Sequence, residues 1–388
     1  MKKIAIIGKG TAGCITAASF FHNTRIEIDW YFDPNSPAQS VGEGSTIGFP
    51  EFLRKDLDWT YPHLKSMDGT FKHGIRKINW GGSGDYVHPF PIETTGIHFN
   101  ASKLQQKIIK KLQDKVTFIP KEINNYSNID ADHIINCSGK PKDYKDYNIS
   151  HGIPVNAAYI TQCYWDNPTF DYTLTMARPY GWVFGIPLQN RCSIGYLYNH
   201  NINTEEEVKE DIKEVFKFLN ILPSNQTNSL KFNNYYKKTN FTERVTYNGN
   251  SSFFLEPLEA TSLGTMLHIQ VLLLNRMFNG NISINECNLS YLNELQEAEF
   301  MISLHYLAGS KFDTKFWKFA KEKAIKSFHT NRNKKWEKMY KQVLDLQKMG
   351  KTHSEDRKTS HGQWTIESYN INLKELDLFN KINNLLKT

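Results

Sequence analysis

The feature that most constrains the fold is a glycine-rich segment that directly follows a short apolar run. Residues 3–7 predict a buried strand, Gly8-Lys9-Gly10-Thr11-Ala12-Gly13 follows at once, and residues 14–22 predict a helix. In this context a GxGxxG motif indicates dinucleotide binding. The first glycine permits the turn, the second lets the backbone approach a pyrophosphate, and the third lets the helix pack on the strand. A glycine-rich turn without a ligand is the alternative interpretation.

A second strand supplies the acid that this motif requires. Residues 26–32 predict a strand, and Asp33 follows it twenty residues after Gly13, where a carboxylate accepts from the ribose 2′-OH. Two later segments bear on the cofactor: a second glycine-rich turn at residues 41–46 and a late strand at 132–139 that ends in small residues. Two further segments of this kind could contact a long cofactor at a distance from the first turn. They favour FAD over NAD, because the flavin end of FAD must be held far from that turn.

Two carboxylates stand out in the apolar stretch 252–264. Glu256 and Glu259 lie three residues apart, just before a helix-like segment that ends at Asn279-Gly280. The N-terminal end of a helix offers unpaired backbone N–H groups to a small anion. Because burying a carboxylate without a partner is costly, a carboxylate beside such a site would be unusual if its role were only structural. The alternative interpretation is an ordinary Glu-Pro turn before a helix, and the stretch by itself does not decide between the two.

The remaining segments predict regular elements around a second sheet. By composition, residues 69–80 indicate an edge strand with solvated cations and residues 85–90 a loop. Residues 362–364 place an isolated aromatic, Trp364, in a polar tail. We also expect a helix over 101–112, an aromatic strand over 179–188 with a hairpin partner at 193–198, a helix over 205–219 opened by a Thr204/Glu207 capping box, and mostly helical structure from residue 289 onward.

Composition excludes several classes of protein. With 39% hydrophobic and 22% charged residues, the chain is typical of a soluble globular protein, and a net charge of +7 is too modest to indicate nucleic-acid binding. The basic residues between 311 and 351 predict a solvated face over a packed aromatic stripe. Five cysteines form no CxxC pair and no metal-ligand spacing, and no apolar segment approaches the ~20 residues of a membrane helix. We therefore expect a cytoplasmic protein with reduced thiols, no metal site and no membrane contact.

Taken together, the motifs resemble those of flavin-dependent halogenases of the tryptophan-halogenase type, on the flavin-monooxygenase fold. The family's GxGxAG, GVGEAT, FK…NW, H-x-F, DCSG, GWxWxIP, FLEPLESTG and HY…PFW have counterparts here in the same order. They are Gly8 to Gly13, Val41 to Thr46, Phe71-Lys72 with Asn79-Trp80, His88 to Phe90, Asn136 to Gly139, Gly181 to Pro187, Phe254 to Ser262, and His305-Tyr306 with Phe316-Trp317.

The resemblance implies an FADH2-dependent enzyme that uses O2 and chloride, bromide or iodide to halogenate an aromatic, indole- or phenol-like substrate. Hypohalous acid would pass to Lys72, Glu259 would orient the electrophile or take the ring proton, and backbone N–H groups at Thr261 and Ser262 would hold the halide. We expect His88, Phe90 and Trp364 to line the substrate pocket. The residues expected to contact FAD are Gly8, Gly10, Thr11, Ala12, Gly13, Asp33, Gly42, Glu43, Ser45 and Thr46.

The resemblance also implies an organisation. We expect an α/β, Rossmann-like FAD-binding module over residues 1–280, with a substrate-binding sheet inserted at about 63–100 and 160–240, and a helical substrate-covering region over 281–388. No NAD(P)H module is visible, so a separate flavin reductase is implied as a partner. The oligomeric state stays open, a homodimer included.

The chain departs from the family pattern at three places. Phe184 replaces the second tryptophan of GWxWxIP, Ser262 replaces a glycine beside the expected halide, and only sixteen residues separate Trp80 from Ile97, where typical members carry a longer insert. Because this insert helps to cover the substrate in typical members, its shortness here argues against tryptophan itself as the substrate. The serine at position 262 leaves the halide preference open.

Two other functions compete with halogenation. A flavin-dependent aromatic hydroxylase shares the fold but has no use for Lys72 with Glu259, and a non-catalytic flavin-binding protein would suit the short cover, Phe184 and Ser262. Lys72 and Glu259 could also be a buried ion pair of structural importance only. The presence of both residues in the family's motifs favours the halogenase.

Overall fold

The computed structural model describes residues 2–36, 43–91, 93–165, 168–354 and 359–387. The chain forms two compact units, each built from several segments. The first contains Met1–Thr70, Ile97–Ile149 and Tyr235–Glu294, and the second contains Phe71–Gly96, Ser150–Asn234 and Leu295–Thr388.

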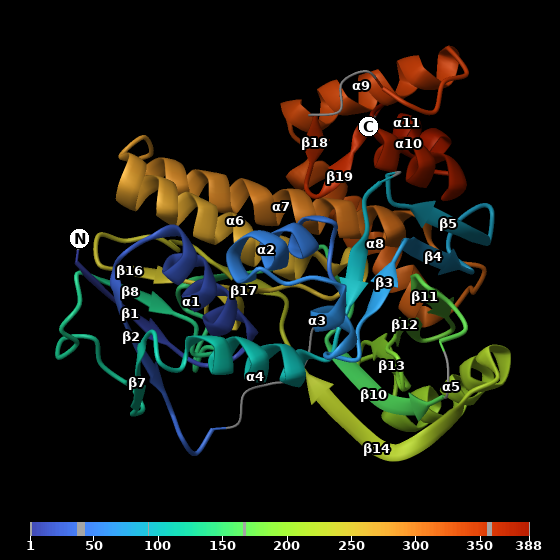
Figure 1. The fold of residues 1–388 in the computed structure, drawn as a ribbon. Helices are drawn as coiled ribbons and strands as arrows, with labels where there is room; N and C mark the ends of the chain where they lie inside the picture. The colour runs from blue at the N-terminus through green and yellow to red at the C-terminus, as the bar shows by residue number, and fades with distance from the viewer. Residues whose placement is uncertain (1, 37–42, 92, 166–167, 355–358, 388) are drawn as a thin grey trace. The chain divides into compact units, whose positions relative to one another are not determined.

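The first unit is organised around a five-stranded parallel sheet (Figure 1). Its strand order is β16 (Val245–Tyr247), β8 (His133–Asn136), β1 (Lys3–Ile7), β2 (Glu27–Phe32) and β7 (Thr117–Pro120), and all neighbours pair in parallel. The apolar residues of β1 are buried on both faces, as expected for the central strand of a covered parallel sheet. The predicted α/β, Rossmann-like fold is confirmed.

Helices of the first unit begin where the sequence predicts them. The segment after the glycine turn forms α1 (Thr11–Asn23), which packs against α4 (Ala101–Leu112) and α6 (Thr261–Leu274). The side chain of Asn100 caps α4 by accepting from the N–H of Lys103. The other helical elements of this unit are α2 (Gly48–Leu57), α3 (Tyr61–Lys65), the short turns η1 (Gly249–Ser251) and η2 (Leu258–Ala260), and a π-helical turn η3 (Asn275–Asn279) that continues α6.

Two small sheets complete the strands associated with this unit. β9 (Tyr147–Ile149), β15 (Tyr235–Lys237) and β17 (Phe253–Phe254) form an antiparallel sheet with β15 in the centre. β3 (Thr70–Lys72) pairs with β6 (Gly96–His98) where the chain leaves the first unit and returns to it.

The second unit is organised around a seven-stranded sheet. The order is β14 (Leu222–Lys231), β10 (Ala157–Tyr164), β13 (Arg191–Tyr198), β12 (Gly181–Pro187), β11 (Thr173–Arg178), β4 (Gly74–Ile78) and β5 (Asp85–Pro89). β12 and β13 form the predicted antiparallel pair, in register from Gly181 opposite Tyr198 to Pro187 opposite Cys192.

Two predictions for this sheet were wrong. β4 is not an edge strand with solvated cations, because it lies between β11 and β5, and both Lys72 and Lys77 are fully buried. Residues 85–89 are not a loop but strand β5, whose period-two alternation buries Tyr86 and His88. Successive side chains of β5 face opposite sides of the strand, and the structure buries Tyr86 and His88 while the apolar Val87 stays exposed, so the residue types gave no strand pattern.

In the second unit, helix α5 (Glu205–Leu219) has the bounds and the N-terminal capping box that the sequence predicts. In this box the Thr204 hydroxyl accepts from the Glu207 N–H at 3.2 Å and the Glu207 carboxylate accepts from the Thr204 N–H at 2.8 Å. α7 (Ile284–Ala308) begins in the first unit and ends in the second. The last elements are α8 (Lys315–Asn331), α9 (Lys334–Lys348), β18 (Ser360–His361), β19 (Trp364–Thr365), α10 (Ile366–Glu375) and α11 (Phe379–Leu385).

The C-terminal segment also corrects the sequence analysis. Trp364 is not an isolated aromatic in a polar tail, because it is 2% exposed and its ring contacts those of His88, His305 and Tyr369. As predicted, the basic stretch from 311 to 351 packs Trp317, Trp336 and Tyr340 inward while most of its lysines face solvent.

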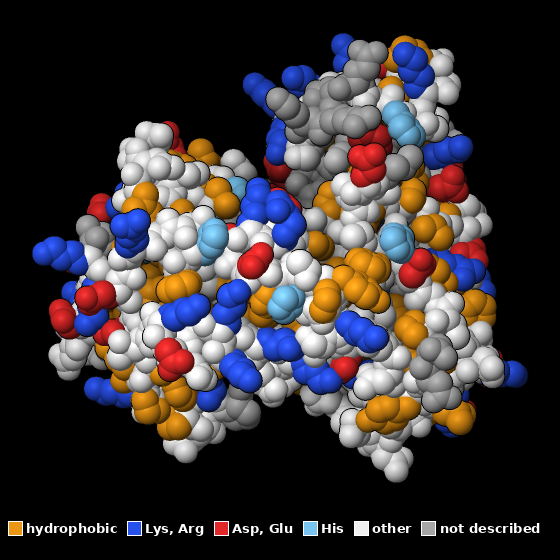
Figure 2. Space-filling view, in the orientation of Figure 1, with side chains coloured by type: hydrophobic (Ala, Val, Ile, Leu, Met, Phe, Trp, Pro, Cys, Tyr) orange, Lys and Arg blue, Asp and Glu red, His pale blue; other side chains and the backbone are white. Residues whose placement is uncertain are grey.

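The surface and the thiols agree with the composition. On the face shown in Figure 2, lysine and arginine side chains are interspersed with acidic and hydrophobic ones. All five cysteines are free and buried. Within the described residues, no helix has the length and apolar character needed to cross a membrane.

Candidate functional site

The glycine turn has the geometry that the GxGxxG motif predicts. Gly8 has φ of +104°, and a Cβ there would lie 2.2 Å from the carbonyl oxygen of Cys137. A Cβ on Gly13 would lie 2.0 Å from the Gly8 oxygen, so this glycine lets α1 approach the turn. A Cβ on Gly10 would meet nothing within 4 Å. The open space at Gly10 is the cradle that a pyrophosphate requires.

A large cavity opens over this turn in the first unit. Its volume is about 940 Å³, and it lies along the carboxyl ends of β1, β2, β8 and β16. Ligands bind at this edge of open α/β sheets, where helix N-termini and loops meet. Of the predicted cofactor residues, those that line the cavity are Gly8, Gly10, Thr11, Ala12 and Asp33, and the sequence analysis did not assign its other wall, which includes Ser138, Gly139 and Asn250.

Asp33 is held at the end of β2 by its own turn. Its Oδ1 accepts a hydrogen bond from the N–H of Asn35 at 2.8 Å. This bond to the backbone holds the carboxylate in place at the wall of the cavity. The indole N–H of Trp30 donates to the Gly8 carbonyl at 2.8 Å and ties β2 to the glycine turn. The open cradle, the cavity and the placed acid together fit a dinucleotide.

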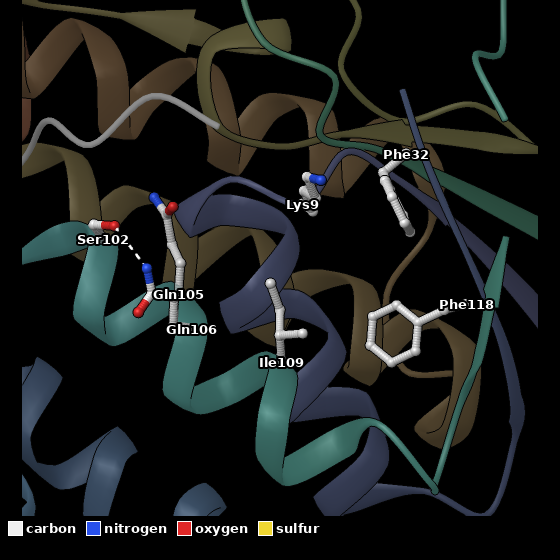
Figure 3. A pocket seen from close by; sticks show the side chains of 7 residues that line it. All are labelled: Lys9, Phe32, Ser102, Gln105, Gln106, Ile109 and Phe118. Atoms are coloured by element: carbon white, nitrogen blue, oxygen red, sulfur yellow. Dashed lines mark hydrogen bonds between the residues drawn. The ribbon is translucent and has the colours of Figure 1, made fainter. Parts of the chain in front are cut away.

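A smaller cavity of about 320 Å³ lies beside the first, between α4 and the ends of β2 and β7 (Figure 3). The rings of Phe32 and Phe118 meet edge-on at 6.4 Å, and the Lys9 ammonium lies 4.2 Å from the Phe32 ring centroid. The amide of Gln105 donates to the Thr11 hydroxyl at 3.0 Å, and that of Gln106 donates to the Ser102 hydroxyl at 3.3 Å. Aromatic walls with nearby amides suit a planar, hydrogen-bonding ring. The helical pattern of α4 gave no signal for this role.

The second glycine-rich segment, predicted at residues 41–46 and called the strap from here on, is joined to β6 by hydrogen bonds through Ser45. Glu43 and Ser45 are buried. The Ser45 N–H donates to the Ile97 carbonyl at 2.9 Å, and the Ser45 hydroxyl accepts from the Ile97 N–H at 2.9 Å. The Thr46 carbonyl accepts from the N–H of Phe49 as α2 begins. Gly42 lies outside the described residues, and cofactor contact by this strap stays a prediction.

The start of α6 carries two residues with left-handed backbone. Glu259 has φ of +71° and Ala260 has φ of +54°. Each non-glycine residue costs about 1–2 kcal/mol in this conformation, and such strain concentrates at functional sites. Glu259 is only 5% exposed, and Glu256 is also buried.

Thr261 and Ser262 open α6 directly after this strained pair. Thr261 is buried and Ser262 is half-buried. Ala260, the N-cap residue, has no side chain that could cap the first turn. A helix start of this kind attracts an anion to its backbone N–H groups.

In the second unit, Lys72 joins the predicted substrate residues. Its side chain is completely buried at the end of β3, and Nζ lies 5.4 Å from the ring centroid of Phe90. The His88 ring lies 6.4 Å from that of Phe90 and 5.9 Å from that of Trp364, and its Nε2 is 2.9 Å from the Ser368 hydroxyl. The structure thus brings Lys72, His88, Phe90 and Trp364 into one cluster.

A buried polar network in the same unit was missed from the sequence. Lys77 Nζ donates to Nε2 of His305 at 2.8 Å and to the Asn372 amide oxygen at 2.7 Å, which also accepts from the Tyr86 hydroxyl. Because an ammonium only donates, His305 accepts at Nε2 and donates from Nδ1 to the Met301 carbonyl at 3.2 Å. The network fastens α7 and α10 to β4. No spacing signal joins positions so far apart in the chain.

Several family motifs meet in one aromatic cluster of the second unit. The ring of Trp80 lies 6.3 Å from Trp182, 5.9 Å from Tyr306 and 5.4 Å from Trp317. These residues are buried and support the sheet. Phe184, at the departure from GWxWxIP, lies over Gly195, where a Cβ would stand 2.2 Å from its ring.

These features define a class of protein. A cavity over a glycine-rich turn at the carboxyl edge of a parallel sheet is typical of a dinucleotide-binding α/β protein, and here a second unit with a mixed sheet buries a lysine beside aromatic rings. A family model described as tryptophan halogenase matches residues 3–127 and 93–371, and the chain belongs to that family.

Individual relatives are distant. The chain is 25% identical over 169 residues to the tryptophan 6-halogenase SttH of Streptomyces toxytricini, covering 42% of this chain and 32% of that protein. It is 25% identical over 239 residues to the tryptophan 7-halogenase RebH of Lentzea aerocolonigenes, covering 55% and 44%. These matches therefore span less than half of either relative.

Solved structures show the same fold over nearly the whole chain. The tryptophan 5-halogenase MibH superposes with a TM-score of 0.81 at 16% identity, covering 97% of this chain and 86% of that one. The flavin-dependent halogenase BrvH from Brevundimonas sp. BAL3 superposes with a TM-score of 0.76 at 19% identity, covering 98% and 90%.

Proposed function

We propose that this protein is an FADH2-dependent halogenase of small aromatic substrates. The observation that carries the proposal is the completely buried Lys72, whose ammonium faces the ring of Phe90 beside His88 and Trp364. The overall reaction is FADH2 + O2 + X⁻ + ArH + H⁺ → FAD + ArX + 2 H2O, in which oxygen is reduced and the halide is oxidised. Membership in the tryptophan halogenase family supports this reaction.

The cavity of the first unit would hold the flavin dinucleotide. The pyrophosphate would lie at Gly10 and the start of α1, and Asp33 would accept from the ribose. When bound, reduced flavin and O2 supply the oxidant that converts halide to hypohalous acid. The backbone N–H groups at Thr261 and Ser262 would hold the halide, with no side chain at Ala260 to compete for them.

Lys72 would hold the electrophilic halogen for transfer. An ammonium has three donors and no acceptor, so it can hydrogen-bond the oxygen of hypohalous acid, or lose a proton and accept the halogen on nitrogen with release of water. The complete burial of Lys72 keeps bulk water away from it, which would otherwise compete with the substrate.

Glu259 would take the proton that the halogenated ring carbon loses. Its buried carboxylate is fixed by a strained turn, and a base that is positioned in this way contributes roughly 10²–10⁴-fold to a proton transfer.

Substrate and partners follow from the same chemistry. His88, Phe90 and Trp364 offer ring faces and edges to a planar indole or phenol. The relatives named above as tryptophan halogenases support an indole-type ring. A separate flavin reductase would supply FADH2, and the five free cysteines suit the reducing cytoplasm.

The test is a reconstituted reaction. The protein would be incubated with FAD, a flavin reductase, NADH, air, bromide or chloride, and a panel of indoles and phenols. We expect products with a halogen isotope pattern in mass spectrometry that require the protein. Oxygen insertion without halogen would replace the proposal by a hydroxylase, and protein that does not bind FAD at all would refute both.

A further inference from the structure

A second lysine, Lys237, lines the large cavity of the first unit and lies outside every family motif. It ends β15, is 8% exposed, and forms part of the cavity wall. Its backbone N–H is fixed by the Ser252 carbonyl at 2.8 Å and the Tyr291 hydroxyl at 3.0 Å. These two hydrogen bonds fix the backbone position from which the Lys237 side chain starts.

The ammonium of Lys237 lies close to two tyrosine rings. Nζ lies 4.3 Å from the ring centroid of Tyr247 and 4.7 Å from that of Tyr147, and both tyrosines also line the cavity. Ring faces attract a cation but accept no strong hydrogen bond, so they hold the ammonium without satisfying its three donors.

No acceptor for these donors is found among the described residues. Within the residues that the structure describes, Nζ of Lys237 makes no hydrogen bond and has no carboxylate oxygen within ion-pair distance. Burial lowers the pKa of Lys237, while the charges of Asp146 and Asp143, which also line the cavity, act in the opposite direction. A nearly buried cation at the wall of a cavity requires an acceptor for its donors, and the cavity can hold one.

The cavity offers further groups that an oxygen-rich anion can use. Lys140 and Lys142 also line it, together with the acidic Asp143 and Asp146, and the turn η1 contributes the backbone at Gly249, Asn250 and Ser251. We propose that Lys237, held by Tyr147 and Tyr247, binds a phosphoryl group in this cavity and is a second anion site beside the start of α1. The inference rests on the proposed function only where the phosphoryl group is that of FAD itself.

The test compares two neighbouring lysines. Lys237→Met keeps the length of the side chain and removes its charge, and Lys238→Met is the control, because Lys238 is exposed and donates to the Lys145 carbonyl at 2.8 Å. Calorimetric titrations would use inorganic phosphate, pyrophosphate, FAD and riboflavin. We expect K237M to bind phosphate-bearing probes about tenfold more weakly, riboflavin unchanged, and K238M as wild type.

The probes separate the sources of the phosphoryl group. A loss for FAD together with pyrophosphate assigns Lys237 to the cofactor's own diphosphate, and a loss for phosphate and pyrophosphate alone assigns it to a separate phosphate ion. Unchanged affinity for all phosphate-bearing probes in a folded K237M would overturn the proposal. Failure of the wild type to bind FAD would count against the halogenase, while the inorganic probes would still decide the role of Lys237.

A measurement on the wild type avoids any folding problem of the variant. Lysines would be acetylated with a limiting reagent, with and without pyrophosphate, and each site followed by mass spectrometry. We expect pyrophosphate to slow modification of Lys237 several-fold, whereas exposed lysines such as Lys315 keep their rates. Equal rates at Lys237 in both samples would refute the site.

Discussion

Replacing Gly10 by alanine should separate cofactor binding from folding. A Cβ at Gly10 meets no atom within 4 Å, and the residue's φ of −71° is ordinary for any L-residue. The change removes a good N-cap residue but also reduces the entropy of the unfolded chain, so the free energy of unfolding should change by less than about 1 kcal/mol. The added methyl group occupies the space that a pyrophosphate approaches, so FAD affinity should fall at least about tenfold, or ~1.4 kcal/mol.

The matched control is Gly13→Ala in the same motif. Its Cβ would lie 2.0 Å from the Gly8 carbonyl oxygen, so α1 must move away from the turn. Overpacking of this kind costs about 1–3 kcal/mol of stability. Urea unfolding would measure stability, and quenching of flavin fluorescence would measure binding. If G10A bound FAD as tightly as wild type, the cofactor would not lie against Gly10 and the assignment of the cradle would be wrong.

Three further predictions test the other unit, the strained turn and the buried histidines. Lys72→Ala should reduce halogenation at least about a hundredfold while reduced flavin is still oxidised, and mass spectrometry of products with parallel flavin absorbance would check this; normal halogenation would refute the role of Lys72. Ala260→Gly should raise the free energy of unfolding by up to about 1 kcal/mol, because glycine relieves the left-handed φ, and urea unfolding that shows destabilisation would contradict the strain. Burial lowers the pKa of both His133 and His361 from 6.5 to about 4, so between pH 6.5 and 4 these histidines bind protons in the unfolded chain but not in the folded chain. Each histidine should therefore lower the free energy of unfolding by up to about 3 kcal/mol as the pH falls through this window. His133→Gln should remove about half of this loss of stability, which urea unfolding measured at a series of pH values would check.

Local patterns predicted the elements that depend on neighbours in the chain. β1, the glycine turn and α1 follow from an apolar run, three glycines and small residues. The start of α5 follows from the Thr204/Glu207 capping box, which needs contacts over only one turn of helix. Asp33 at the end of β2 also follows, because strand length and turn geometry fix its distance from the motif.

Burial and partners of the lysines did not follow from the sequence. Composition alone indicated solvated cations at residues 69–80, but the sheet buries both Lys72 and Lys77, and Lys77 finds its acceptors 228 and 295 residues away. The family motif singled out Lys72, whereas neither motif nor spacing pointed to Lys77.

The sequence by itself determined the dinucleotide-binding turn, the order of the motifs and the family to which the chain belongs, because these depend on residue identity at short spacing. Only the tertiary structure decided that residues 85–89 form a strand, that Trp364 packs on His88, and that Lys237 lies close to the rings of Tyr147 and Tyr247. The physical reason is that each of these depends on which distant side chains remove a group from water, and the local chain does not encode that choice.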